Sequence, residues 1–151
     1  MKITFNLKEP NKAESLILLF CRWNGNLVKL STRHRIECRT WNKNKQKCSI
    51  SKSKYSDESN YISEKTNKFL AELLDAIQGY VLSDNFNEEM TASSSVRDSI
   101  ESLIELQVEE ENQNLKKLQQ NPIEFFKELD CRFNANAVDF CHKGTNPIKH
   151  Y

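Results

Sequence analysis

Residues 16–36 read Leu-Ile-Leu-Leu-Phe-Cys-Arg-Trp-Asn-Gly-Asn-Leu-Val-Lys-Leu-Ser-Thr-Arg-His-Arg-Ile, and this stretch decides the fold. It opens with an apolar run over 16–23, which is typical of a β-strand. The run meets Asn24-Gly25, the dipeptide that supplies positive φ for a two-residue hairpin turn. The chain is therefore expected to return as an antiparallel strand over about 27–36.

The return strand has two faces of different chemistry. Side chains alternate between the faces of a strand, so Val28 and Leu30 share an apolar face. The opposite face carries Lys29, Ser31, Arg33 and Arg35. Residues 2–8 alternate in the same way, with apolar side chains at Ile3, Phe5 and Leu7. We predict three short antiparallel strands with one strongly cationic face.

Past a polar stretch at 42–56, which we expect to be a flexible loop, the apolar period lengthens to three and four residues. This spacing predicts a helix over about 59–82. Thr91 is a candidate N-cap for a second helix over 93–120, whose narrow apolar stripe indicates an exposed connecting helix. Pro122 opens a third helix. The predicted fold class is α+β: a three-stranded antiparallel sheet packed on a helix, followed by further helices.

Charge is divided unevenly along the chain. The formal net charge is only +1, from 22 basic and 21 acidic residues. Residues 1–55 hold 13 of the basic residues and 3 of the acidic ones, a local net charge of +10, whereas residues 56–151 carry −9. An asymmetry of this size suggests a polyanionic partner for the basic part.

The cationic strand face is the candidate binding surface. Alternate residues on a strand are roughly 6–7 Å apart, so a row of cations can meet phosphates and base edges of DNA together. Arginine bonds a guanine edge bidentately, and we expect Arg33 and Arg35 to read bases. The phosphate contacts are expected from Lys2, Lys8, Lys29, Arg39, Lys43, Lys45 and Lys47, and Arg22 and Ser31 complete the DNA-binding set. The alternative is a solvated strand face.

Other functions find little support. The longest apolar run is far too short for a bilayer span, and the start lacks the pattern of a signal peptide. The five cysteines suit free thiols in a reducing cytoplasm, and Cys38, Cys48 and His34 lack the spacing of a zinc site. We therefore expect a cytoplasmic protein that is not an enzyme, with no catalytic residues, no metal, no cofactor, no membrane contact and no small-molecule substrate.

The order of these features resembles a known family. Segment 31–42 reads Ser-Thr-Arg-His-Arg-Ile-Glu-Cys-Arg-Thr-Trp-Asn. It is similar to a segment in the amino-terminal arm-binding domain of Bacteroidetes-type tyrosine recombinases (phage integrases), which runs Ser-Thr-Gly, a basic residue, an aliphatic residue and then Trp-Asn or Trp-Asp. In this chain, Arg33 occupies the position of the glycine in that segment. The resemblance continues at Asn-Lys-Phe-Leu (67–70), Met-Thr-Ala (90–92) and Pro-Ile-Glu-Phe-Phe (122–126).

This resemblance implies a DNA-binding fragment of a site-specific recombinase. An arm-type DNA-binding domain would occupy 1–85, a connecting helical segment 86–120, and the start of a truncated SAM-like core-binding domain 121–151. The sheet would enter the major groove of arm-type sites, with double-stranded DNA and other recombinase protomers as partners, and the recombinase's catalytic domain is absent from this chain. The alternative function is a protein-interaction module that uses its acidic helices and binds no specific DNA.

Overall fold

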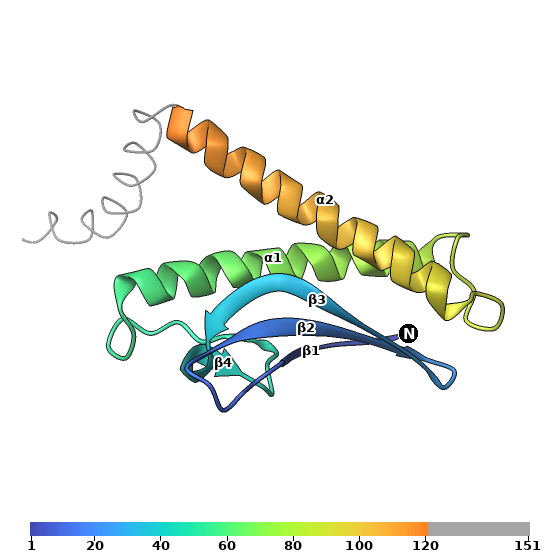
Figure 1. Ribbon diagram of the computed structural model, residues 1–151, viewed down its shortest axis with the longest axis horizontal. Helices are drawn as coiled ribbons and strands as arrows, with labels where there is room; N and C mark the ends of the chain where they lie inside the picture. Colours follow the sequence, from blue (N-terminus) through green and yellow to red (C-terminus); the bar gives the residue numbers. More distant parts are fainter. Residues whose placement is uncertain (121–151) are drawn as a thin grey trace, which may run out of the picture. The chain divides into compact units, whose positions relative to one another are not determined.

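The computed structural model describes residues 1–120 and opens with the predicted sheet. β1 (Lys2–Leu7), β2 (Glu14–Trp23) and β3 (Asn26–Glu37) pair antiparallel in the order β1-β2-β3 (Figure 1). Two long helices follow, α1 (Asp57–Leu82) and α2 (Ser93–Gln120). The predicted α+β class is confirmed. The helical segment expected over 121–151 lies outside the described residues.

The connection between β2 and β3 is the predicted two-residue hairpin turn. Asn24 (φ 41°) and Gly25 (φ 76°) both have positive φ, as a type I′ turn requires. The twist of such a turn matches the right-handed twist of the strands that it joins. Pairing therefore begins directly at the turn, where Trp23 lies opposite Asn26.

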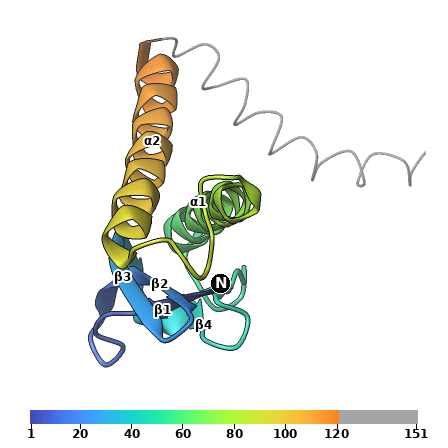
Figure 2. The ribbon, with the colours of Figure 1, turned by 90° about the vertical axis from the view of Figure 1, so that its right-hand side faces the viewer.

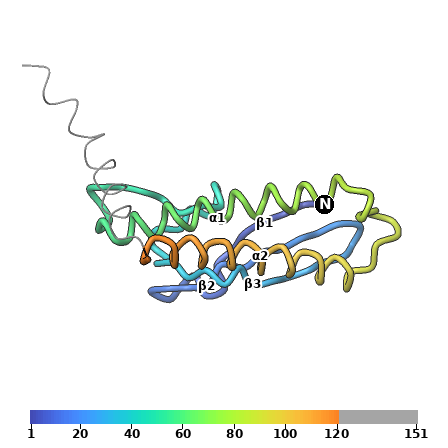
Figure 3. Tube along the Cα trace, turned by 90° about the horizontal axis from the view of Figure 1, so that it is seen from above, coloured from blue at the N-terminus to red at the C-terminus, as the bar shows by residue number. Residues whose placement is uncertain are grey.

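The core lies between one face of the sheet and the two helices. Every second side chain of β2 is buried there: Ser15, Ile17, Leu19, Cys21 and Trp23. Figure 2 shows α1 and the first half of α2 on the same side of the sheet, and Figure 3 shows them from above. Their apolar stripes complete the core with Phe69, Leu70, Leu73 and Ile77 from α1 and Val96, Ile100 and Ile104 from α2.

The first half of α2 is more buried than its narrow apolar stripe suggested. Val96, Ile100 and Ile104 are at most 1% exposed. In the loop before α2, the ring of Phe86 packs edge-on against Trp23 with their centroids 6.1 Å apart. The compact unit consequently runs from Met1 to Val108, beyond the domain expected over 1–85, and a second unit begins at Glu109 within α2.

The polar stretch expected to be a flexible loop is ordered by side chains of α1. It follows a short 3-10 helix, η1 (Cys38–Thr40), and forms a hairpin of β4 (Trp41–Asn42) and β5 (Lys47–Cys48). Asn67 accepts from the N–H of Cys48 at 2.7 Å and donates to its carbonyl at 2.9 Å. Asn60 makes the same pair of bonds with Ser51, at 3.0 and 3.2 Å. Each asparagine thus supplies the backbone partners that a neighbouring strand would offer.

β3 carries a bulge where it passes Ile17. Leu18 of β2 lies opposite Ser31, but Leu16 lies opposite Arg35. Three residues of β3, 32–34, therefore face one residue of β2. An insertion of this kind bends the strand and changes the direction of the side chains within it.

The hydroxyl groups of Ser31 and Thr32 satisfy the backbone inside the bulge. Ser31 Oγ accepts from the N–H of Arg33 at 3.1 Å, and Thr32 Oγ1 donates to the carbonyl of Ile17 at 2.9 Å. Between these bonds Arg33 has φ 65°, in the left-handed region that favours glycine. Thr32 is fully buried, so its hydroxyl needs this partner.

Comparing Arg33→Gly with Arg33→Ala measures the cost of the left-handed backbone. Both variants lose the guanidinium group, but only alanine keeps the Cβ that crowds this conformation. We expect the glycine variant to be more stable than the alanine variant by about 1 kcal/mol in urea denaturation. At Arg35, which lacks a positive φ, the order should reverse, because glycine loses more backbone entropy on folding. Equal stability of the two variants at position 33 would contradict the bulge geometry.

Candidate nucleic-acid interface

The face of the sheet away from the core holds most of the predicted contact residues. Within the compact unit 1–108, both helices lie on the other side of the sheet (Figures 1 and 2), so this outer face is open. We define the outer face by the alternate side chains that point away from the core: Lys2, Thr4, Asn6, Lys8, Glu14, Leu16, Leu18, Phe20, Arg22, Leu27, Lys29, Ser31 and Arg35.

The register of the strands arranges the outer face in rows. The rows, read across the sheet, are Lys2–Arg22–Leu27, Thr4–Phe20–Lys29 and Asn6–Leu18–Ser31, and Leu16 lies opposite Arg35. The middle strand therefore carries an apolar strip in which Leu16 and Phe20 are half-buried and Leu18, between them, is buried by its neighbours. Side chains of the two outer strands flank this strip; they are polar or basic except for the exposed Leu27.

The outer face is strongly basic. Its five cations are Lys2, Lys8, Arg22, Lys29 and Arg35, and all five are exposed. Their charge reaches the β1–β2 loop, where a hydrogen bond from Lys12 lowers the pKa of Glu9 and the charges of Lys8 and Arg35 add to the effect. An acidic residue, Glu14, lies at the far end of β2. A phosphate would therefore meet favourable charge over most of this face.

Arg33 leaves the predicted row of alternate strand side chains. The bulge directs it to α2, where Arg33 Nη2 donates to Glu105 Oε1 at 2.9 Å. The side chains are 48% and 55% exposed, so water screens the pair, and such pairs contribute about 0–1 kcal/mol. Lys29, Ser31 and Arg35 remain on the outer face, as predicted, without Arg33 between them.

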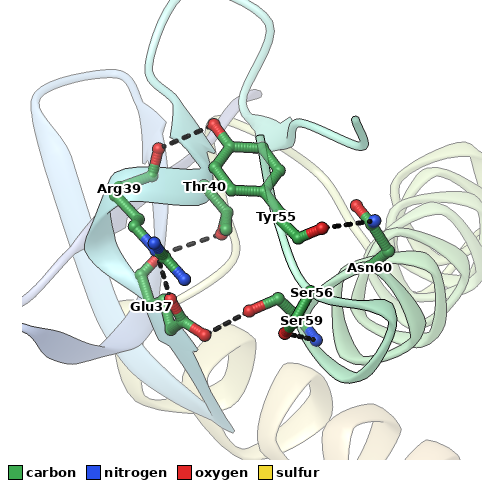
Figure 4. Close-up of polar contacts among 7 residues, drawn as sticks. All are labelled: Glu37, Arg39, Thr40, Tyr55, Ser56, Ser59 and Asn60. Carbon is green, nitrogen blue, oxygen red and sulfur yellow. Dashed lines mark hydrogen bonds and ion pairs between the residues drawn. The ribbon is translucent and has the colours of Figure 1, made fainter. Parts of the chain in front are cut away.

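Arg39 is held by a polar cluster at the start of α1 (Figure 4). Its Nε donates to Glu37, and its guanidinium lies 5.6 Å from the ring centroid of Tyr55. The hydroxyl of Ser59 donates to the same carboxylate, and Ser56 caps the helix by accepting from the N–H of Ser59 at 3.1 Å. The Arg39 side chain, which is 60% exposed, is thus held by Glu37 and Tyr55.

The three lysines predicted to contact phosphate lie on the β4–β5 hairpin. Lys43 and Lys45 are in its turn and Lys47 is in β5, and all three are exposed. Gln46, between them, accepts from the N–H of Phe5 in β1 at 2.9 Å. This bond places the basic turn beside the free edge of β1 and satisfies a backbone group of that edge.

His34 and Trp41 pack against the core. The ring of His34 stacks on Phe69 with centroids 3.9 Å apart, and its Nδ1 lies 3.1 Å from the carbonyl of Thr32. Trp41 is partly buried and packs against the core cluster. Neither side chain is therefore presented on the outer face.

Three other predictions concern thiols, metals and membranes. Burial raises the pKa of the Cys21 and Cys48 thiols to about 11, so both are protonated near neutral pH. Within residues 1–120, no cluster of three ligating side chains could hold a metal ion. No helix in that range is long and apolar enough to span a bilayer.

The sequence reasoning missed the apolar strip on the outer face. Residues 16–20 are Leu-Ile-Leu-Leu-Phe, so β2 is apolar on both faces. A middle strand with one wet face would normally alternate apolar with polar residues. The lack of alternation was the available signal that the outer face has an apolar centre.

No family model, curated protein or solved structure matches the chain.

Replacing Ser59 with alanine should remove a hydrogen bond from the Glu37 carboxylate and raise its pKa. The hydrogen bond from Ser59 is the main cause that lowers the pKa of Glu37, with the bond from Arg39 second. A lowered pKa stabilises the fold at pH values above the ordinary carboxyl pKa, and this contribution is lost as the pH falls through the lowered value. We expect Ser59→Ala to raise the pKa of Glu37 towards 4.5, as followed by ¹³C NMR of its carboxyl group. Ser94→Ala, at an exposed site on α2, is the control; an unchanged pKa in Ser59→Ala would refute the assignment.

Proposed function

We propose that the chain binds double-stranded DNA through the outer face of its sheet. The observation that carries the proposal is the open sheet face on which five cations surround an apolar strip. A face that met only water would normally carry polar side chains where Leu16 and Phe20 lie half-buried at its centre. A surface that is basic around its rim and apolar in the middle matches a groove with phosphates at its walls and bases at its floor.

The dimensions of the sheet suit the major groove. Neighbouring strands are about 4.8 Å apart, so the backbones of β1 and β3 are separated by roughly 10 Å. The major groove of B-DNA is about 12 Å wide and admits a β-ribbon. With β2 along the centre of the groove, β1 and β3 would each lie near one phosphate backbone.

This placement divides the work among the side chains. Lys2, at the start of β1, and Lys8, directly after its end, are positioned for phosphates, which give affinity without sequence preference. Arg35 and Ser31, beside the apolar strip, are the candidates for hydrogen bonds to base edges. The basic β4–β5 turn beside β1 extends the phosphate contacts along one wall of the groove.

The resemblance to arm-binding domains of tyrosine recombinases gains physical support from the bulge. The Ser-Thr pair of the motif satisfies the backbone of the bulge, and the family's glycine falls at Arg33, where φ is positive. The Asn-Lys segment at 67–70 begins with the asparagine that holds Cys48. We accordingly propose a DNA-binding fragment of a site-specific recombinase that recognises arm-type sites, acts with other protomers on that DNA and cuts no DNA by itself.

The salt dependence of DNA binding tests this proposal. Each phosphate contact that is lost should reduce the slope of log K against log salt by about 0.9. We expect Lys8→Gln, directly after β1 on the outer face, to reduce the slope by about that amount on a mixture of random-sequence duplexes. Lys68→Gln, on the exposed surface of α1, should leave the slope unchanged. Binding that is absent or independent of salt would refute the proposed function, and equal effects of the two variants would refute the proposed face.

A further inference from the structure

Phe20 occupies an unusual position at the centre of the outer face. It lies on the middle strand, half-buried by its neighbours although neither helix covers it. Thr4 lies opposite it on one side and Lys29 on the other. The Nζ atom of Lys29 is 5.6 Å from the centroid of the Phe20 ring. An apolar ring and a hydrogen-bond donor are thus held side by side on the open face.

Thymine presents the complementary pair of groups in the major groove. Its C5-methyl group is adjacent to the O4 acceptor, and among the four bases of DNA it is the one that carries a methyl group there. An apolar side chain contacts that methyl favourably, and an ammonium group can donate to O4. Guanine offers two acceptors without a methyl group, and cytosine offers a donor that would repel a cation.

The position of Phe20 on the sheet favours contact with a base over contact with a phosphate. β2 is the middle strand, so a sheet in the groove would place this strand nearest the base edges. Arg22 lies two residues beyond Phe20 on β2, and Arg35 of β3 lies opposite Leu16. To complement this face, a protein partner would need an apolar patch surrounded by acidic side chains. DNA offers the same combination, because its phosphates lie on both sides of the thymine methyl group.

We propose that Phe20 and Lys29 together read one thymine in the bound DNA. The ring packs on the C5-methyl group while the ammonium donates to O4. This inference rests on the proposed DNA-binding function and names the base that the centre of the outer face selects. It makes Phe20 a specificity-determining residue and assigns Lys29 to a base in place of a phosphate.

Removing single methyl groups from the DNA tests the inference with the unmodified protein. Duplexes bound by the full chain would be selected from a random pool, and each thymine of a selected duplex would be replaced in turn by deoxyuridine. We expect one position at which this replacement weakens binding about fourfold, the effect of losing one buried methyl group. The other thymines should tolerate uracil.

Variants of Phe20 then assign the methyl contact. Phe20→Ala should bind the thymine and uracil duplexes equally at that position, and Phe20→Leu should keep part of the preference. The matched control is Tyr61→Ala on α1, where Lys65 Nζ lies 5.2 Å from the ring centroid of Tyr61. This control removes the same type of aromatic–cation pair from another surface, and its preference for thymine should be that of the unmodified chain.

The possible outcomes separate this inference from the proposed function. If the chain selects no duplex from the pool, both the thymine inference and the proposed DNA-binding function are refuted. Salt-dependent binding that ignores every thymine methyl group would overturn the inference and leave DNA binding in place. A methyl preference that persists in Phe20→Ala would also overturn it, because another side chain would then read the methyl group.

Discussion

The burial of one face of β2 under two helices is the constraint on which the rest of the structure depends. Side chains alternate along a strand, so burial of Ile17, Leu19 and Cys21 against α1 and α2 places their neighbours on the opposite face. Because both edges of β2 are paired with other strands, its remaining surface is that outer face. The open basic surface is therefore a direct consequence of how the core is packed.

The bulge in β3 determines which cations share that surface. A regular strand would place Arg33 in line with Lys29 and Ser31, as the alternation predicted. The two extra residues of the bulge turn Arg33 to Glu105 and restore the alternation in time for Arg35 to lie opposite Leu16. The hydroxyls of Ser31 and Thr32 compensate the backbone groups that lose their strand partners. Local backbone geometry thus selects the residues available to a ligand.

Much of the fold could be predicted from apolar spacing and turn chemistry. The strands, the Asn24-Gly25 turn and both helices follow from patterns that span a few residues. The bulge could not, since Arg33 adopts a backbone conformation that its side chain does not favour. The order in the polar stretch depends on Asn60 and Asn67, whose partners are distant in sequence. The burial of the first half of α2 depends on a sheet face that its own narrow stripe does not reveal.

The sequence predicted that the candidate site is basic, but it predicted less well which basic side chains lie together on the outer face. Lys29, Ser31 and Arg35 lie on the outer face as the alternation requires, but Arg39 is held by Glu37 through a contact that composition does not encode. The apolar strip was visible as missing alternation in β2, and it changes the chemistry of the face. A purely cationic surface would suit any polyanion, whereas cations around an apolar centre suit the floor and walls of a DNA groove.

Covalent labelling of lysine amines, with and without duplex DNA, tests the central claim most directly. Mass spectrometry would report the labelling of each lysine by an acylating reagent. The account predicts that DNA protects Lys2, Lys8 and Lys29 on the outer face while Lys65 and Lys68 on α1 react as before. Protection of the α1 lysines, or no protection of the outer face at saturating DNA, would contradict it.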